Sequence, residues 1–164
     1  MSNNELAEDL VLFILGETGG QLRGATRLQK IAFLIVMETG VKGIEFEPSE
    51  YGPYSRDIAN AVKELEKRGL IVVRHEVVPE SDKGYREVYE LASRDAAKHA
   101  KERLFGWHVI RRGIARDIVW LWKDAPLIAL IEYVYRKYPE YAAKSLIKDK
   151  VEDLVKALSR MYSL

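Results

Sequence analysis

The amino-acid sequence predicts a mainly α-helical protein that contains one small β-hairpin, an α+β fold class. Three observations support this fold class. Apolar residues recur at helical spacing over the first part of the chain. A turn, a helix, a glycine and a strand follow one another over residues 51–78. A second strand at residues 85–91 completes a hairpin, after which the pattern is helical again.

The first two helices are predicted from apolar periodicity and from the glycines that follow it. Residues 5–15 place their apolar side chains at helical spacing, and Gly16 and Gly20 come next. Residues 26–38 form the second helix. Gly40 closes it, because glycine adopts the left-handed conformation of a helix end without a Cβ clash. The apolar face of this second helix is broad, which indicates burial on more than one side.

The third helix has the clearest boundaries in the sequence. Residues 44–54 are predicted to be irregular, and Ser55 is placed to cap the helix that follows. A serine hydroxyl at this position can accept hydrogen bonds from the exposed amides of the first turn. The helix is predicted to run to about Lys67, with Gly69 as its C-terminal stop.

A β-hairpin follows directly on the third helix. Residues 70–78 are rich in β-branched side chains, residues 79–84 form a polar turn, and residues 85–91 alternate as a return strand. A helix followed at once by such a hairpin is typical of the recognition helix and wing of a winged helix-turn-helix. We therefore expect this fold over residues 1–92.

The remaining residues, 93–164, are predicted to form a helical C-terminal extension. Asp124 can cap a helix that has Pro126 in its first turn, where a proline loses no hydrogen bond, and Pro139 marks the end of that helix. A last amphipathic helix covers residues 149–161. The change near residue 93 divides the chain into two units, although a core shared across this point is the alternative.

One face of the predicted third helix carries four nitrogen-donor side chains. On an ideal helix they lie within about 60° of one another, opposite an aliphatic stripe of Ile58, Val62 and Leu65. A helix in the major groove needs such a row, with cations for phosphates and Arg or Asn donors for base edges. We expect Arg56 and Asn60 to contact base edges, and Lys63 and Lys67 to contact phosphates.

Five further cations are candidates for DNA contacts around this helix. Lys83 lies at the turn of the wing, and Arg74 and Arg86 lie on its strands. Arg27 and Lys30 begin the preceding helix, which crosses the DNA backbone in this class of fold. The alternative for all of these residues, and for the row on the third helix, is an ordinary solvated surface. Asp57 and Glu64 beside that row favour the alternative, since carboxylates repel phosphate.

The overall charge does not indicate a polyanion as partner. The chain has 26 basic and 25 acidic residues, and a formal net charge of +1. Any DNA surface must therefore be a local patch. There is no cysteine, no basic and apolar leader at the N-terminus, and no apolar run long enough to cross a bilayer. We expect a cytoplasmic protein without a membrane segment.

Sequence motifs for catalysis or cofactor binding are absent. His75, His99 and His108 lie far apart in the sequence and lack the spacing of metal ligands. Residues 16–20 are glycine-rich but do not end in the Gly-Lys-Ser/Thr of a phosphate-binding loop. We expect neither an enzyme nor a bound metal or cofactor.

Three segments resemble a known family. They are Arg27-Leu-Gln-Lys-Ile-Ala-Phe-Leu-Ile35, Tyr51-Gly-Pro-Tyr-Ser55 and Leu65-Glu-Lys-Arg-Gly-Leu-Ile71. The chain is similar in these segments to the YwgA-like winged-helix proteins and, more distantly, to the Panacea (SocA-like antitoxin) domain. The resemblance implies a winged helix and, through Panacea, an antitoxin role exercised through protein partners. It implies no catalytic residues, and Gly52, Pro53 and Tyr54 of its turn are expected to be structural.

The tryptophans of the C-terminal extension suggest a partner. Trp120 and Trp122 point to different sides of one helix, and residues 119–122 are apolar all round. A homodimer interface or a wholly intramolecular core would each explain this pattern. The sequence as a whole favours a DNA-binding transcriptional regulator without catalysis. The alternative is a protein-interaction module of antitoxin type that does not bind DNA.

Overall fold

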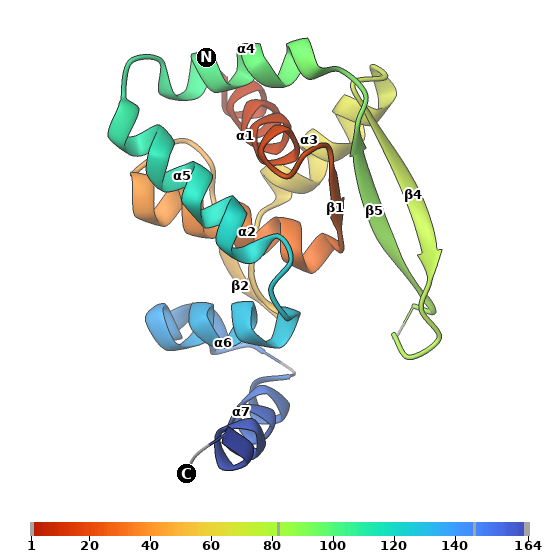
Figure 1. Cartoon of the computed structure of the whole chain (residues 1–164), viewed down its shortest axis with the longest axis vertical. Coiled ribbons are helices and arrows are strands. Elements are labelled where there is room, and N and C mark those ends of the chain that lie inside the picture. Colours follow the sequence, from red (N-terminus) through yellow and green to blue (C-terminus); the bar gives the residue numbers. More distant parts are fainter. Residues whose placement is uncertain (1, 82, 146, 163–164) are drawn as a thin grey trace.

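The computed structural model describes residues 2–81, 83–145 and 147–162. Asp82 of the predicted turn, together with Met1 and Leu164 at the ends of the predicted units, lies outside the described residues. The first half of the chain folds in the order expected of a winged helix (Figure 1). Its elements are α1 (Asn3–Glu17), β1 (Gln21–Arg23), α2 (Ala25–Thr39), β2 (Glu47–Ser49), β3 (Gly52–Tyr54), α3 (Arg56–Lys67), β4 (Ile71–Val77) and β5 (Tyr85–Leu91).

The wing is a long antiparallel hairpin that extends away from the helices (Figure 1). β4 and β5 pair from Ile71 opposite Leu91 to Val77 opposite Tyr85. The short strand β1, which the sequence pattern did not reveal, pairs with the other edge of β5, so the sheet order is β1-β5-β4. This mixed helix and sheet architecture confirms the predicted fold class.

The connection between α2 and α3 differs from that of a simple helix-turn-helix. That motif joins its helices by a turn of about three or four residues, whereas here residues 40–55 connect them. Gly40 ends α2 in the left-handed conformation. The segment expected to be irregular then contains a small hairpin of β2 and β3, with Pro48 opposite Pro53. The hairpin places Ser55 at the start of α3.

In the described part of residues 94–162, four α-helices and one 3₁₀ turn follow: α4 (Arg94–Phe105), α5 (Val109–Trp122), α6 (Leu127–Lys137), η1 (Pro139–Ala142) and α7 (Lys148–Tyr162). α4 packs on α1, and α5 packs on α2. α7 contacts the rest of the protein mainly through α6. Pro126 directly precedes α6, as its N-cap. In the described residues, no helix is long and apolar enough to cross a membrane.

A single hydrophobic core joins the two predicted units. The buried ring of Phe13 on α1 meets that of Phe105 on α4 edge to face, with 5.0 Å between centroids. Gly16 lets these two helices approach closely, because a Cβ at this position would lie 3.0 Å from that of Ala97. The core continues through α5 and α6 as far as Val151 of α7. The boundary near residue 93 is therefore a change in the sequence pattern, and the hydrophobic core extends across it.

Candidate nucleic-acid interface

α3 is held in place by a buried polar clamp at its first turn. The Ser55 hydroxyl accepts from the backbone N–H of Ile58 at 3.3 Å, which confirms the predicted cap. The backbone N–H of Ser55 donates to Gln29 Oε1 at 2.9 Å, and Gln29 Nε2 donates back to the Ser55 carbonyl at 3.0 Å. Both residues are buried. One glutamine of α2 thus fixes where α3 begins.

Lys30 lies inside the protein, so the expectation that it contacts phosphate is wrong. Its side chain is 2% exposed, and its Nζ donates to the Pro53 carbonyl at 3.2 Å. Burial lowers the pKa of the Lys30 ammonium to about 7, because a low-dielectric environment disfavours its charge. Lys30 supports the backbone of β3 from inside the protein, and its ammonium group is not accessible to a ligand.

Arg27 also serves the fold. One of its guanidinium nitrogens donates to the carbonyls of Trp122 and Ala125, at 2.6 and 2.7 Å. The Trp122 carbonyl lies at the end of α5, where helix geometry leaves carbonyls without intrahelical donors, and Ala125 belongs to the connection between α5 and α6. Partial burial lowers the pKa of Arg27. Arg27 thus links α2 to the α5–α6 connection, and its expected phosphate contact stays a prediction.

The outward face of α3 keeps all four predicted donors at the surface. Arg56 is 82% exposed and makes a loose ion pair of 3.6 Å with Glu47. Asn60, Lys63 and Lys67 are exposed, and no hydrogen bond or ion pair in the described part of the chain engages their side chains. The opposite face is buried through Ile58, Ala61 and Leu65. α3 is therefore anchored by one side and free to contact a ligand with the other.

Acidic side chains flank this face at both ends. Asp57 accepts from the backbone N–H of Glu45 at 3.1 Å, which holds both residues beside the start of α3. Glu64 lies 3.9 Å from Arg68, whose guanidinium also pairs with Glu8. The positive strip on α3 is thus narrow, as the sequence pattern indicated.

The wing arginines are paired with carboxylates of the same sheet. Arg74 donates to Glu90 at 2.7 Å. Arg86 and Arg23 both donate to Glu76 at 3.2 Å, and the hydrogen bond from Arg86 does most to lower the pKa of that carboxyl group. These pairs are half-exposed, where solvent screening weakens an ion pair, so phosphate can replace the carboxylates at small cost. Lys83 is exposed at the wing turn.

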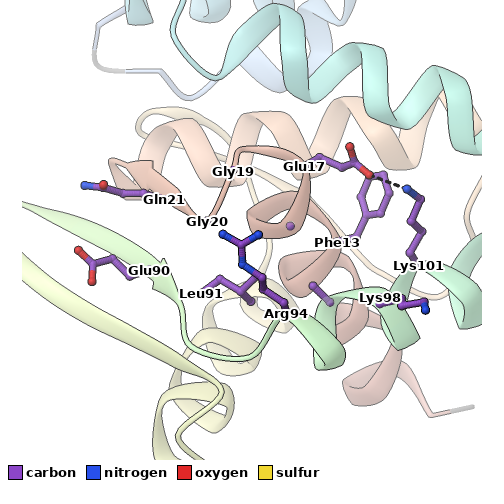
Figure 2. Close-up of a pocket in the computed structure, with 12 residues that line it drawn as sticks. Phe13, Glu17, Gly19, Gly20, Gln21, Glu90, Leu91, Arg94, Lys98 and Lys101 are labelled. Atoms are coloured by element: carbon purple, nitrogen blue, oxygen red, sulfur yellow. Dashed lines mark hydrogen bonds and ion pairs between the residues drawn. The ribbon is translucent and has the colours of Figure 1, made fainter.

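A cleft of about 530 Å³ lies away from the predicted residues, between the end of α1 and the start of α4 (Figure 2). Lys101 reaches across it to Glu17, with 3.0 Å between Nζ and Oε1. Arg94 and Lys98 line the α4 side, and Glu90 lines the β5 side. Three cations on α4 thus face carboxylates from α1 and β5, a mixture that favours no single charge of ligand.

Substitution of Gly52 tests how tightly the start of β3 is packed. Its φ is +96°, and an added Cβ would lie 2.8 Å from Tyr135 Cε1 and 3.3 Å from Lys30 Cε. We expect Gly52→Ala to lower the free energy of unfolding by about 2 kcal/mol or more, through backbone strain and this clash. Denaturant titration measures the change.

Gly69→Ala is the matched control for Gly52→Ala. Gly69 also has a positive φ, +75°, but a Cβ there meets nothing within 4 Å. Gly69→Ala should therefore lower the free energy of unfolding only by the cost of the backbone strain. Equal losses of stability in the two variants would show that the start of β3 tolerates the added methyl group.

The described residues contain no group of three His, Asp or Glu side chains that could hold a metal ion. Comparisons of the whole chain with protein-family models, curated proteins and solved structures gave no match.

Proposed function

We propose that the protein binds duplex DNA through the outward face of α3 and the tip of the wing, and that it acts as a transcriptional regulator without catalysis. One observation supports this above all. Asn60, Lys63 and Lys67 stand exposed and without partners among the described residues on a helix that is clamped by its other side. Exposed amide and ammonium donors on one helix face are the groups that read base edges and phosphates.

The proposed contacts divide into two kinds. Arg56 and Asn60, in the first half of α3, would reach base edges. Lys63 and Lys67 would contact the phosphate backbone, with Lys83 contributing at the wing. The proposal includes a cytoplasmic location, in keeping with the absence of cysteine.

Salt dependence of DNA binding tests this proposal. Each phosphate neutralised by a protein cation adds about 0.9 to the slope of log affinity against log salt concentration. The double variant Lys63→Ala/Lys67→Ala should therefore bind more weakly and reduce the slope by about 2. Fluorescence anisotropy of a labelled mixed-sequence duplex, titrated at several NaCl concentrations, gives both quantities.

Lys150→Ala/Lys156→Ala is the charge-matched control, because both lysines are exposed on α7. It should keep the wild-type slope. The proposal fails if the wild-type protein does not bind DNA at low salt. It also fails if the α3 pair and the α7 pair change the slope equally.

A protein-interaction module that does not bind DNA is the second candidate. The carboxylates of Glu45, Glu47 and Asp57 around the start of α3 favour it, since they would repel a phosphate backbone. Absence of DNA binding at low salt would select this candidate.

A further inference from the structure

α5 exposes an unusual amount of apolar surface. Trp107, just before the helix, is 97% exposed, and Ile110 in its first turn is 79% exposed. The exposed set, called the α5 face below, is Trp107, Val109, Ile110, Ile114, Trp120 and Leu121. Large side chains gathered in this way on one surface mark an interaction site in soluble proteins.

The members of the α5 face that belong to the helix lie on one side of it. With Val109 set at zero on an ideal helix, Ile110, Leu121 and Ile114 fall at about 100°, 120° and 140°. The inward residues Ala115, Ile118 and Val119, which are buried, fall on the other side of the helix. Exposure on this stripe is therefore not a consequence of a frayed or poorly packed helix.

The area of this face suits a stable dimer. With about 150–250 Å² for each tryptophan, Trp107 and Trp120 alone expose on the order of 300 Å², and the four aliphatic residues add to this. The largest apolar patch on a typical monomer is about 300–600 Å². A standard protein interface buries about 800 Å² on each partner. The α5 face thus reaches the size of the large patches that monomers leave in water, and it can form the apolar centre of one half of an interface.

The charges on the face are compatible with a second copy of the same chain. Its acidic residue, Asp117, is already paired with Arg116 at 3.3 Å, and Arg116 lies over the Trp120 ring at 4.9 Å. Arg111 and Arg112 fall at about 200° and 300° on the same wheel, beyond the apolar stripe on either side. A face whose centre is internally neutral, on a chain of net charge +1, does not select an acidic or a basic partner.

We infer that two chains form a homodimer by packing their α5 faces together about a two-fold axis. Gly113 lies at about 40° on the same wheel, within the face, and a Cβ there would meet nothing within 4 Å. Two helices can approach closely at such a position. The inference is independent of DNA binding, because the experiments below contain no DNA.

Ile110→Glu tests the interface against a matched substitution. Analytical ultracentrifugation over a range of concentrations should find the wild-type protein dimeric. Ile110→Glu should raise the dimer dissociation constant by on the order of 1,000-fold, because the buried charge occurs twice in a two-fold interface. Val77→Glu, at a wing residue that is also 79% exposed, should leave the dimer unchanged.

Gly113→Lys separates loss of the dimer from loss of folding. Glycine is a poor helix residue, and the introduced ammonium group would face Asp117 one turn on, so the Gly113→Lys monomer should melt at or above the temperature of the Ile110→Glu monomer. The bulk and charge of the new side chain should still break the dimer. A wild-type protein that stays monomeric at every concentration overturns the inference. So does a dimer that Leu158→Glu on α7 breaks while Ile110→Glu leaves it intact.

Discussion

Replacing Gln29 with alanine is expected to lower the free energy of unfolding by about 3 kcal/mol. The side chain makes two hydrogen bonds to the Ser55 backbone, one through its oxygen and one through its nitrogen. After truncation the Ser55 N–H is buried without an acceptor, whereas the Ser55 carbonyl keeps the N–H of Ala59 as a donor. Denaturant unfolding followed by circular dichroism measures the loss.

Two variants isolate the contribution of this clamp. Gln21→Ala removes a glutamine side chain from β1 and should change the stability by less than about 0.5 kcal/mol. Gln29→Glu keeps an acceptor for the Ser55 N–H but loses the donor to its carbonyl, and it buries a charge, so it should be no more stable than Gln29→Ala. A Gln29→Ala protein as stable as Gln21→Ala would mean that the clamp does not hold α3.

Replacing Lys30 with methionine is expected to change how stability depends on pH. The pKa of Lys30 is about 7 in the folded chain, against an ordinary value of 10.5. Between these values the unfolded chain binds a proton that the folded chain does not, so the free energy of unfolding rises with pH. Below pH 7 both states are protonated and the folded state bears the full cost of the buried charge. Above about pH 10.5 both are neutral and the cost is gone.

Lys30→Met removes this titration. Relative to the wild type, its stability should be highest below pH 7 and should fall by on the order of 5 kcal/mol as the pH rises to about 10.5. The lost hydrogen bond to the Pro53 carbonyl shifts this difference by a constant amount at every pH. Lys63→Met, at an exposed lysine of α3, should differ from the wild type equally across the range. A flat difference for Lys30→Met as well would show that Lys30 stays charged in the fold.

The elements with local signals could be predicted from sequence. α3 begins after Ser55 and ends at Lys67 as expected, because a serine cap and a glycine stop are properties of a few adjacent residues. The two wing strands follow from β-branched residues around a polar turn. β1, β2 and β3 were not predicted, since each is three residues long and β1 exists only through pairing with the distant β5.

The candidate site was predicted less well, because burial depends on tertiary packing. The broad apolar face of α2 was a usable signal for the burial of Lys30. Phe33 and Leu34 lie one turn further along the helix, and both are fully buried. The pairing of Arg86 was not accessible, because the predicted turn over residues 79–84 would place Arg86 opposite Val77. In the structure the connection is one residue longer and Arg86 lies opposite Glu76, where opposite charges on facing strand residues attract. The Gln29–Ser55 clamp had no such signal, because it joins segments whose approach only the fold determines.

The separation between the anchored and the outward sides of α3 bears on how the exposed surface of this helix can change in evolution. Gln29, Ser55 and Leu65 hold the helix, whereas the exposed side chains of Asn60 and Lys63 contribute little to stability. Substitutions at the outward positions can therefore accumulate without loss of the fold. Related chains that keep the anchoring residues are expected to diverge first at these outward positions, and so to recognise different partners with one scaffold.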